Sequence, residues 1–117
     1  MKMATAMRPR FNLWIEVEGQ VALSLWRANL LKTIAAAGSI NAAAEELGIP
    51  YRTAWQKVHE MEERLGVKLL ETHTGGLHGG GARLTPAAEM YLQKLDDLYA
   101  ILIPMVESAY SRVFREP

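Results

Sequence analysis

The sequence has no cysteine, no surplus of charge of either sign and no long apolar run. The absence of cysteine excludes a disulfide scaffold, a thiolate zinc site and a cysteine nucleophile. The longest strongly apolar run covers residues 100–106, contains Pro104 and is too short to cross a bilayer. Residues 1–11 contain three basic side chains but no sustained apolar stretch, so they are not a signal peptide. We therefore expect a soluble, cytoplasmic protein with no membrane partner.

Thirteen basic residues balance thirteen acidic residues in a chain of 117. This neutrality argues against a strongly basic nucleic-acid binder, whose domain normally carries net positive charge. The charge is unevenly distributed, however: residues 1–15 carry +3, residues 51–83 carry +1 and residues 84–117 carry −2. If the basic part contacts nucleic acid, each subunit makes few phosphate contacts, which predicts a shallow salt dependence of binding.

The residues do not predict an enzyme or a metal site. The carboxylate pairs Glu45–Glu46 and Asp96–Asp97 are adjacent in sequence. On a helix such neighbours point about 100° apart and cannot share a substrate atom. The three histidines, His59, His73 and His78, lack the close spacing of metal ligands.

Apolar residues alternate along residues 13–17 and 21–25, which predicts two strands of a hairpin. Its turn falls at Glu18–Gly19, with Gly19 at positive φ. From Trp26 the apolar period becomes helical, and this first helix is expected to end at Gly38.

A second and a third helix follow. Ser39 is the expected cap of a short helix over residues 40–47, and Pro50 is expected as the first residue of the next helix. That helix has a buried stripe formed by Ala54, Val58, Met61 and Leu65, with Trp55 on its flank. It ends at Gly66.

The two helices around residues 47–50 have the layout of a helix-turn-helix motif. The second helix of such a motif lies in the DNA major groove and presents its N-terminal residues to the bases. Arg52 suits guanine, Gln56 suits adenine, and Thr53 can contact thymine or donate from its hydroxyl. Tyr51 and Lys57 can reach phosphates, as can Ser39 and Asn41 at the start of the preceding helix.

A glycine-rich segment follows the third helix. Strand candidates at residues 67–70 and 82–84 flank a loop with five glycines between residues 75 and 81. Such a hairpin is a wing whose backbone can approach a phosphate or the minor groove. Its polar contacts would come from Thr74, His78 and Arg83, with His73 beside them. A nucleotide-binding P-loop is excluded because no Gly-Lys-Ser/Thr follows the glycines.

The last helix begins with Thr85 as cap and Pro86 in the first turn, and runs towards Phe114. It carries an apolar seam with coiled-coil spacing, which predicts a dimer contact through Tyr91, Leu95, Leu98, Leu102 and Met105. A second apolar line includes Leu92 and Tyr99 and is expected to pack on the domain. The alternative is one broad stripe that faces the core. Pro104 is expected to kink or break this helix.

Several strings resemble known regulators. The segment from Gly38 to Ile49 resembles the first half of the LysR-type helix-turn-helix. Tyr51-Arg52-Thr53-Ala54-Trp55, Glu60-Met61, the two glycine groups and Leu84-Thr85 resemble the DNA-binding domain of molybdate-responsive (ModE-type) regulators. The resemblance covers roughly residues 12–100.

This resemblance implies a transcriptional regulator that binds a palindromic operator as a homodimer, with recognition residues at Tyr51, Arg52, Thr53, Gln56 and Lys57. Family members that sense molybdate carry C-terminal oxyanion-binding domains. The sequence leaves no room for one after residue 117, so molybdate sensing and a cofactor are not expected, and the sequence does not identify an effector.

The expected fold is mainly α: a winged helix-turn-helix with an N-terminal hairpin and a long C-terminal dimerisation helix. We expect a disordered basic tail over residues 1–11, the DNA-binding domain over 12–85 and the dimerisation helix over 86–115. An alternative is a winged-helix protein–protein interaction module without specific DNA binding. The acidic residues Glu60, Glu62 and Glu63 on the third helix favour that alternative.

Overall fold

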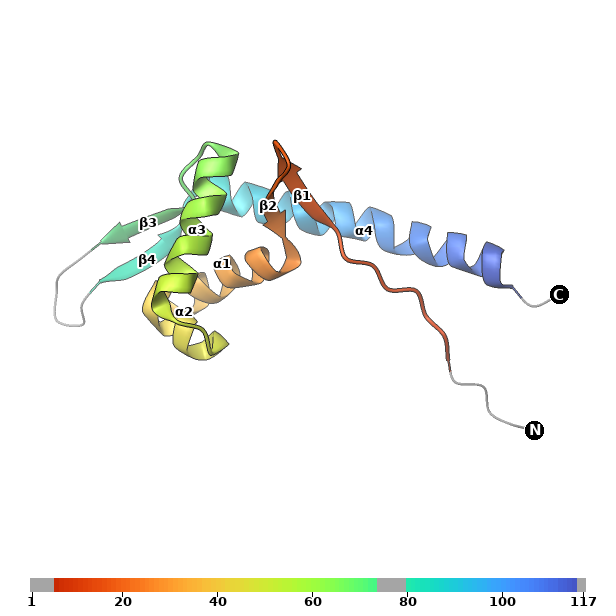
Figure 1. Ribbon diagram of the computed structural model, residues 1–117, viewed down its shortest axis with the longest axis horizontal. Helices are drawn as coiled ribbons and strands as arrows, with labels where there is room; N and C mark the ends of the chain where they lie inside the picture. The colour runs from red at the N-terminus through yellow and green to blue at the C-terminus, as the bar shows by residue number, and fades with distance from the viewer. Residues whose placement is uncertain (1–5, 74–79, 116–117) are drawn as a thin grey trace.

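The structure is a computed structural model that describes residues 6–73 and 80–115. In chain order the elements are β1 (Trp14–Val17), β2 (Gln20–Ser24), α1 (Leu25–Ala37), α2 (Ile40–Leu47), α3 (Tyr51–Leu65), β3 (Leu70–His73), β4 (Gly81–Leu84) and α4 (Pro86–Phe114). Figure 1 shows α1, α2 and α3 gathered beside the two-stranded wing, with α4 extending away from them. The expected winged helix-turn-helix architecture is confirmed.

The N-terminal hairpin forms as the alternation predicts. Strands β1 and β2 are antiparallel, and Glu18 and Gly19 form the turn between them. Both turn residues have positive φ, 51° and 79°. That combination is typical of the tight hairpin turn whose twist matches the strands. The sequence predicted a positive φ for Gly19 alone, and the structure adds a second positive φ at Glu18.

Helix ends follow their capping residues. Ser24 and Ser39 accept hydrogen bonds from the backbone N–H groups of Arg27 and Ala42, at 3.1 and 3.0 Å. Because Ser24 is the cap, α1 begins at Leu25, where the sequence analysis had placed the end of a strand. Pro50 was expected inside α3, but it precedes the first helical residue, with ψ at 146°. A proline in that position has no side chain with which to cap the helix.

The core lies where the three short helices meet the start of α4. Its fully enclosed side chains include Leu30, Leu31, Ile34, Val58 and Met61. Ala43, Ala44 and Ala54 are also buried, and their small side chains let α2 and α3 approach closely. The predicted stripe of α3 is thereby confirmed for Ala54, Val58 and Met61, while Leu65 is half-buried.

The wing consists of β3 and β4, paired antiparallel. Its first strand starts at Leu70 and not at Val67 as expected, because the pairing with β4 begins with Leu70 opposite Leu84. The wing is attached to the helix-turn-helix through the N–H of Ala82, which donates to the carbonyl of Gly38 at 2.8 Å. The predicted tip, with Thr74 and His78, lies outside the described residues.

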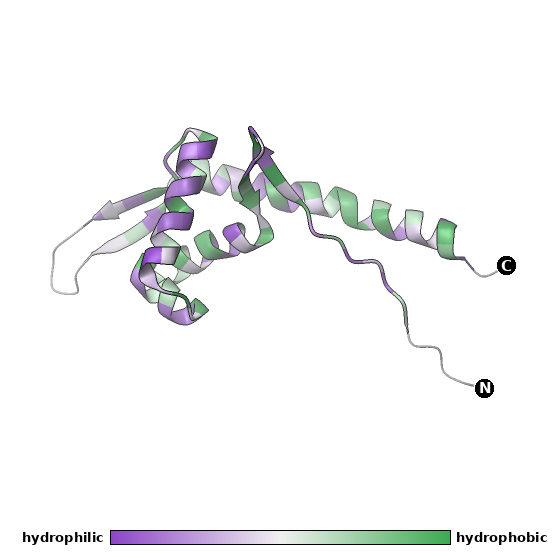
Figure 2. Ribbon diagram, viewed as in Figure 1, coloured by the Kyte–Doolittle hydropathy of each residue, from purple (hydrophilic) through white to green (hydrophobic). Residues whose placement is uncertain are grey.

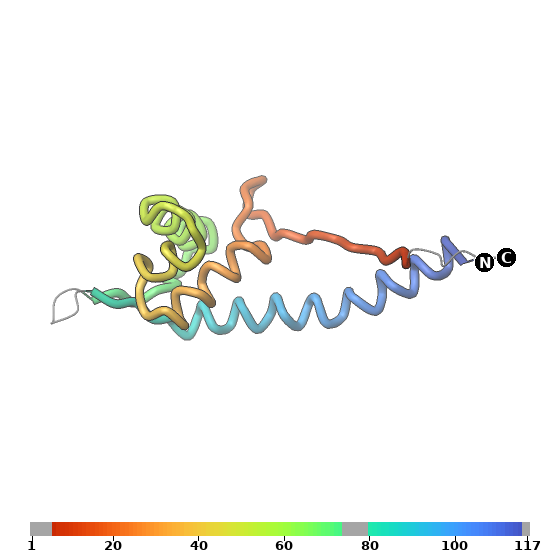
Figure 3. Tube along the Cα trace, turned by 90° about the horizontal axis from the view of Figure 1, so that it is seen from below, coloured from red at the N-terminus to blue at the C-terminus, as the bar shows by residue number. Residues whose placement is uncertain are grey.

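Helix α4 makes the molecule long. The radius of gyration is 18.5 Å, against roughly 13 Å for a compact chain of this length. The helix is continuous from Pro86 to Phe114 with Pro104 inside it, so the alternative of a break is wrong. Its C-terminal part bends relative to its N-terminal part (Figure 3). None of the helices in the described part of the chain is long and apolar enough to cross a membrane.

Only the first part of α4 packs on the domain. Ala88, Leu92 and Leu95 are buried there. The sequence analysis placed Leu95 in a dimer seam, but Leu95 is 2% exposed within a single chain, so its side chain belongs to the domain core. Tyr91 also packs against this core. Figure 2 shows that much of the projecting part of α4 is hydrophobic.

The segment before β1 is attached to α4. The ring of Phe11 stacks on that of Tyr99 at 5.3 Å, and the Tyr99 hydroxyl accepts from the N–H of Leu13 and donates to its carbonyl. Phe11 was expected in a disordered tail. Of that tail the structure describes residues 6–11, which have no regular secondary structure.

Candidate nucleic-acid interface

The N-terminal half of α3 presents its polar side chains away from the core. Arg52 and Gln56 are exposed and lie on the face of α3 opposite Ala54 and Val58. Tyr51 is 50% exposed. Thr53 and Lys57 are half-buried on the side that faces α1. The helix therefore offers a guanidinium and an amide in positions from which they could reach a groove.

The start of α2 contributes less than expected. Asn41 is exposed, as a phosphate contact requires. The Ser39 hydroxyl oxygen, by contrast, already accepts the N–H of Ala42 as a helix cap. Ser39 is left with its hydroxyl hydrogen as a donor, so its first role is to start the helix.

An open groove of about 340 Å³ separates α3 from the wing. Three ring side chains of α3 follow one another at four-residue spacing along it: Tyr51, Trp55 and His59. Trp55 is 44% exposed, and its ring stacks on that of His59 with centroids 3.7 Å apart. His73 lines the groove from the wing.

Sequence reasoning missed this aromatic row. It had placed Trp55 at the edge of the apolar stripe and given His59 no specific role. The four-residue spacing from Tyr51 was the available signal, because side chains at that spacing lie above one another on a helix.

The cation of the wing is already paired. Arg83 and Glu71 are directly opposite each other in β4 and β3, and Nε of Arg83 donates to Oε2 of Glu71 at 2.9 Å. The Arg83 side chain remains 79% exposed. It is thus accessible, as predicted, but its charge is matched by a neighbour that the sequence analysis did not identify.

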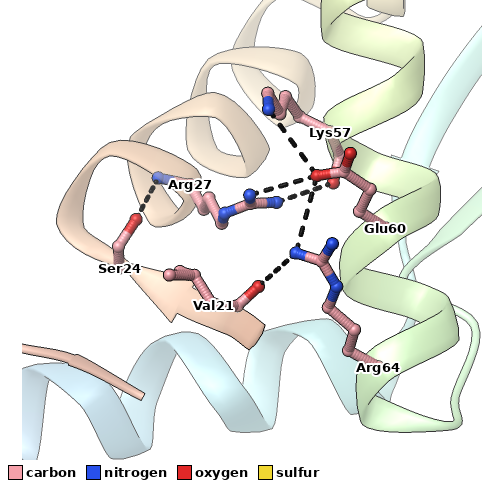
Figure 4. A network of polar contacts seen from close by, with 6 residues as sticks. All are labelled: Val21, Ser24, Arg27, Lys57, Glu60 and Arg64. Atoms are coloured by element: carbon pink, nitrogen blue, oxygen red, sulfur yellow. Dashed lines mark hydrogen bonds and ion pairs between the residues drawn. The ribbon is translucent and has the colours of Figure 1, made fainter. Parts of the chain in front are cut away.

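Charged residues of α3 and α1 form what we call the Glu60 network: Arg27, Lys57, Glu60 and Arg64 (Figure 4). Oε1 of Glu60 lies 3.1 Å from the Arg27 guanidinium, and 3.6 Å from both the Arg64 guanidinium and the Lys57 ammonium. Arg27 is charged and is nevertheless only 8% exposed. The burial of Arg27 was not predicted from the sequence, because a charged side chain normally lies on the surface.

The network lowers the pKa of Glu60. Burial alone raises the pKa of this carboxyl, but the hydrogen bond from Arg27 and the charges of Lys57, Arg27 and Arg64 outweigh it. The net result is a pKa below the ordinary value of 4.5. Glu60 is therefore ionised at neutral pH and holds α3 against α1.

Glu62 also serves the fold. Its Oε2 accepts the backbone N–H groups of Leu69 and Leu70, at 2.8 and 3.3 Å, and so fixes the entry into the wing. Two of the three acidic residues that favoured a protein–protein module are thus engaged inside the domain. Glu63 is exposed. Among the described residues no group of three potential ligands is placed to hold a metal ion.

The fold is shared with solved DNA-binding domains. Over 75% of this chain and 95% of the other, the structure matches the CbnR DNA-binding domain in its DNA complex, with a TM-score of 0.55 and 22% identity. The BenM DNA-binding domain, bound to benA site 1 DNA, matches over 79% of this chain and 98% of its own, with a TM-score of 0.54 and 22% identity.

Curated relatives are more similar in sequence. The DNA-binding transcriptional dual regulator ModE of Escherichia coli K12 is 36% identical over 104 residues, which are 89% of this chain and 38% of that protein. The molybdenum-pterin-binding protein MopB of Rhodobacter capsulatus is 46% identical over 63 residues, which are 54% of this chain and 23% of that protein. The chain thus spans well under half of the length of these relatives.

The model of the family described as bacterial regulatory helix-turn-helix protein, lysR family, matches residues 26–89, from the start of α1 to the first turn of α4. These residues include the helix-turn-helix, the aromatic row and the wing. The chain therefore belongs to the LysR family of bacterial regulatory helix-turn-helix proteins, and it is similar in sequence to part of the ModE relatives.

Proposed function

We propose that this protein is a cytoplasmic transcriptional regulator that binds a palindromic DNA operator as a homodimer. The observation that carries the proposal is the exposed N-terminal half of α3, where the side chains of Arg52 and Gln56 are turned to solvent. The names of the relatives and the DNA complexes of the structural neighbours support it.

In this proposal α3 lies in the major groove. Arg52 donates two hydrogen bonds to a guanine edge, Gln56 pairs with an adenine, and Thr53 contacts a thymine methyl or a base acceptor. Tyr51 and Asn41 contact the sugar-phosphate backbone and fix the register of α3 on the duplex. Backbone contacts position the helix, and base contacts give the sequence preference.

The surface of α4 supports the homodimer. Beyond the domain its exposed apolar side chains include Ile101, Met105, Val113 and Phe114, each about 60% exposed or more. The accessible surface is 8526 Å², against roughly 6,400 Å² for a compact protein of this mass. Part of this excess belongs to the extended segment before β1. The projecting part of α4 also contributes to it, with exposed apolar surface of the kind that marks a contact with another protein.

We place the dimer contact on the projecting part of α4, with Leu98, Leu102 and Met105 from the predicted seam and Ile101 beside them. The names ModE and MopB link the relatives to molybdenum, and we propose that the target genes serve molybdenum metabolism. In this proposal DNA binding itself needs no cofactor.

Selection of bound sequences from random duplex DNA tests the function. The expected result is a palindrome whose half-sites lie about 34–36 Å apart, one turn of the double helix. The Arg52→Ala variant serves as the control and should lose preference at one position of each half-site. If no sequence is enriched and no mobility shift occurs even at low salt, the protein is not a DNA-binding regulator.

A double variant, Leu102→Glu with Met105→Glu, tests the dimer. Sedimentation equilibrium should show monomers, with sharply weaker binding to the selected operator. The matched control is Lys94→Glu, which adds negative charge to an exposed position nearer the domain on the same helix. A dimer that survives the double variant would show that α4 does not form the contact in the way proposed.

A further inference from the structure

The three cations of the Glu60 network are not held equally. The Arg27 guanidinium also donates to the carbonyl of Lys57 at 3.3 Å, and that of Arg64 donates to the carbonyl of Val21 at 2.7 Å. Among the described residues, the recorded ion pair of the Lys57 ammonium is with Glu60 alone, at 3.6 Å. The Lys57 side chain is also the most exposed of the three, at 35% against 10% for Arg27 and 21% for Arg64.

These differences make Lys57 the exchangeable partner. If its ammonium leaves, Glu60 retains two guanidinium groups, and its carboxylate is not left unpaired in a partly buried place. Loss of Arg27 would remove the shortest contact of Glu60 and a link between α1 and α3. A lysine ammonium on a flexible four-carbon stem can also change partner with little movement of the helix.

Lys57 lies at the edge of the surface that we propose contacts DNA, one turn beyond Thr53 on the same side of α3. A DNA phosphate beside α3 is a second anion for this ammonium. In the complex the ammonium would move from Glu60 towards that phosphate, so the two anions would compete for one cation.

We propose that Glu60 is a positioning residue for DNA binding, which holds Lys57 in the free protein and releases it to a backbone phosphate in the complex. This inference rests on the proposed function. It means that the carboxylate which stabilises the fold also lowers DNA affinity, because part of the phosphate contact is offset by the lost ion pair. A residue with a structural role alone would not oppose binding.

A double-mutant cycle with Glu60→Gln and Lys57→Gln tests the proposal. Dissociation constants for the selected operator duplex are measured by fluorescence anisotropy over a range of salt concentrations. Glu60→Gln should tighten binding about twofold to fivefold at low salt, the contribution of a partly exposed ion pair. Lys57→Gln should instead make the salt dependence shallower, by up to about one unit of the logarithmic slope, because it removes the phosphate contact. The tightening caused by Glu60→Gln should not occur in the Lys57→Gln background.

Glu63→Gln is the matched control, because it removes the same charge from an exposed position of α3 outside the network. Any tightening that it causes should be the same with and without Lys57. Circular dichroism confirms that each variant is folded at the temperature of the titration. If Glu60→Gln does not fold, Glu60→Asp replaces it, because the shorter side chain draws the carboxylate back from Lys57 while keeping its charge; a smaller, Lys57-dependent tightening is then expected.

Tightening that persists without Lys57, or weaker binding by a folded Glu60→Gln protein, would overturn this inference. An unchanged dissociation constant would overturn it too, while the proposed function would stand. Failure of the unaltered protein to bind any duplex would instead reject the proposed function.

Discussion

The two halves of α3 use their polar and charged residues in opposite ways. In the N-terminal half Arg52 and Gln56 are turned to solvent. In the C-terminal half Glu60, Glu62 and Arg64 bond to α1, to the start of β3 and to β2. One helix thus carries a surface for a partner and a set of attachments to its own domain, and Lys57 lies between them.

This division resolves the objection raised by zero net charge. The acidic residues of α3 would weaken a DNA-binding face if all of them were free. Two of them are instead committed to cations or backbone N–H groups within the domain. The formal charge of the chain therefore understates how favourable the outward face of α3 is for an anionic partner.

Removal of Arg27 should have the largest effect on stability, because it breaks a contact that attaches the C-terminal half of α3 to α1. Arg27→Ala leaves Glu60 without its shortest contact and should lower the free energy of unfolding by about 3–5 kcal/mol. Urea denaturation measures this change. Lys32→Ala removes an exposed ion pair with Asp96 and should cost less than about 1 kcal/mol. Equal losses in the two variants would show that the network does not attach α3 to α1.

Glu62→Ala should have the next largest effect. It leaves the N–H groups of Leu69 and Leu70 without their acceptor and should cost about 2–3 kcal/mol in the free energy of unfolding. Thermal or urea denaturation gives the value. Glu63→Ala, one position further along the same helix, is the control and should stay within about 0.5 kcal/mol. A comparable loss in the control would mean that the effect comes from helix charge and not from the two hydrogen bonds.

Much of the fold follows from local signals in the sequence. Ser24, Ser39 and Thr85 cap helices, and Gly38, Gly48 and Gly66 end three of them at positive φ. These signals act within a few residues, so they can be read without the fold. The position of Pro50 was predicted wrongly by one residue: proline is common at the first helical position, but Pro50 has ψ at 146° and precedes that position.

Contacts between distant residues could not be predicted in this way. Arg27 and Glu60 are 33 positions apart, and Glu71 and Arg83 meet only once the wing is paired. The amphipathic pattern of α4 showed apolar lines, but not where the domain ends along the helix, so Leu95 was assigned to the wrong surface. The base contacts of Arg52 and Gln56 remain predictions. The two side chains are exposed, which such contacts require.

Arg52→Ala changes only the solvent-exposed, N-terminal half of α3. The free energy of unfolding should change by no more than about 0.5 kcal/mol, because Arg52 is exposed. Binding to the operator should weaken by about 1–3 kcal/mol, with a relaxed preference at one base pair. Anisotropy titrations against operators altered at single positions measure both. Equal weakening on every sequence would assign Arg52 to a phosphate contact.

Acidification should produce the smallest effect. Since the pKa of Glu60 is lowered on folding, its network adds stability that is fully present above the ordinary glutamate value of 4.5 and is lost as the pH falls through the lowered value. The unfolding free energy of the unaltered protein should therefore decline below about pH 5 more steeply than that of Glu60→Gln. If the unfolding free energy declines equally in the two proteins, protonation of Glu60 does not contribute to the loss of stability in acid.

The backbone amide signals of α3, followed by NMR during titration with the operator duplex, test the division of this helix most directly. The largest chemical-shift changes should fall on Tyr51–Lys57, with small changes from Met61 to Leu65, where the helix bonds to its own domain. Changes concentrated in the C-terminal half of α3, with the residues around Arg52 and Gln56 unaffected, would contradict the account.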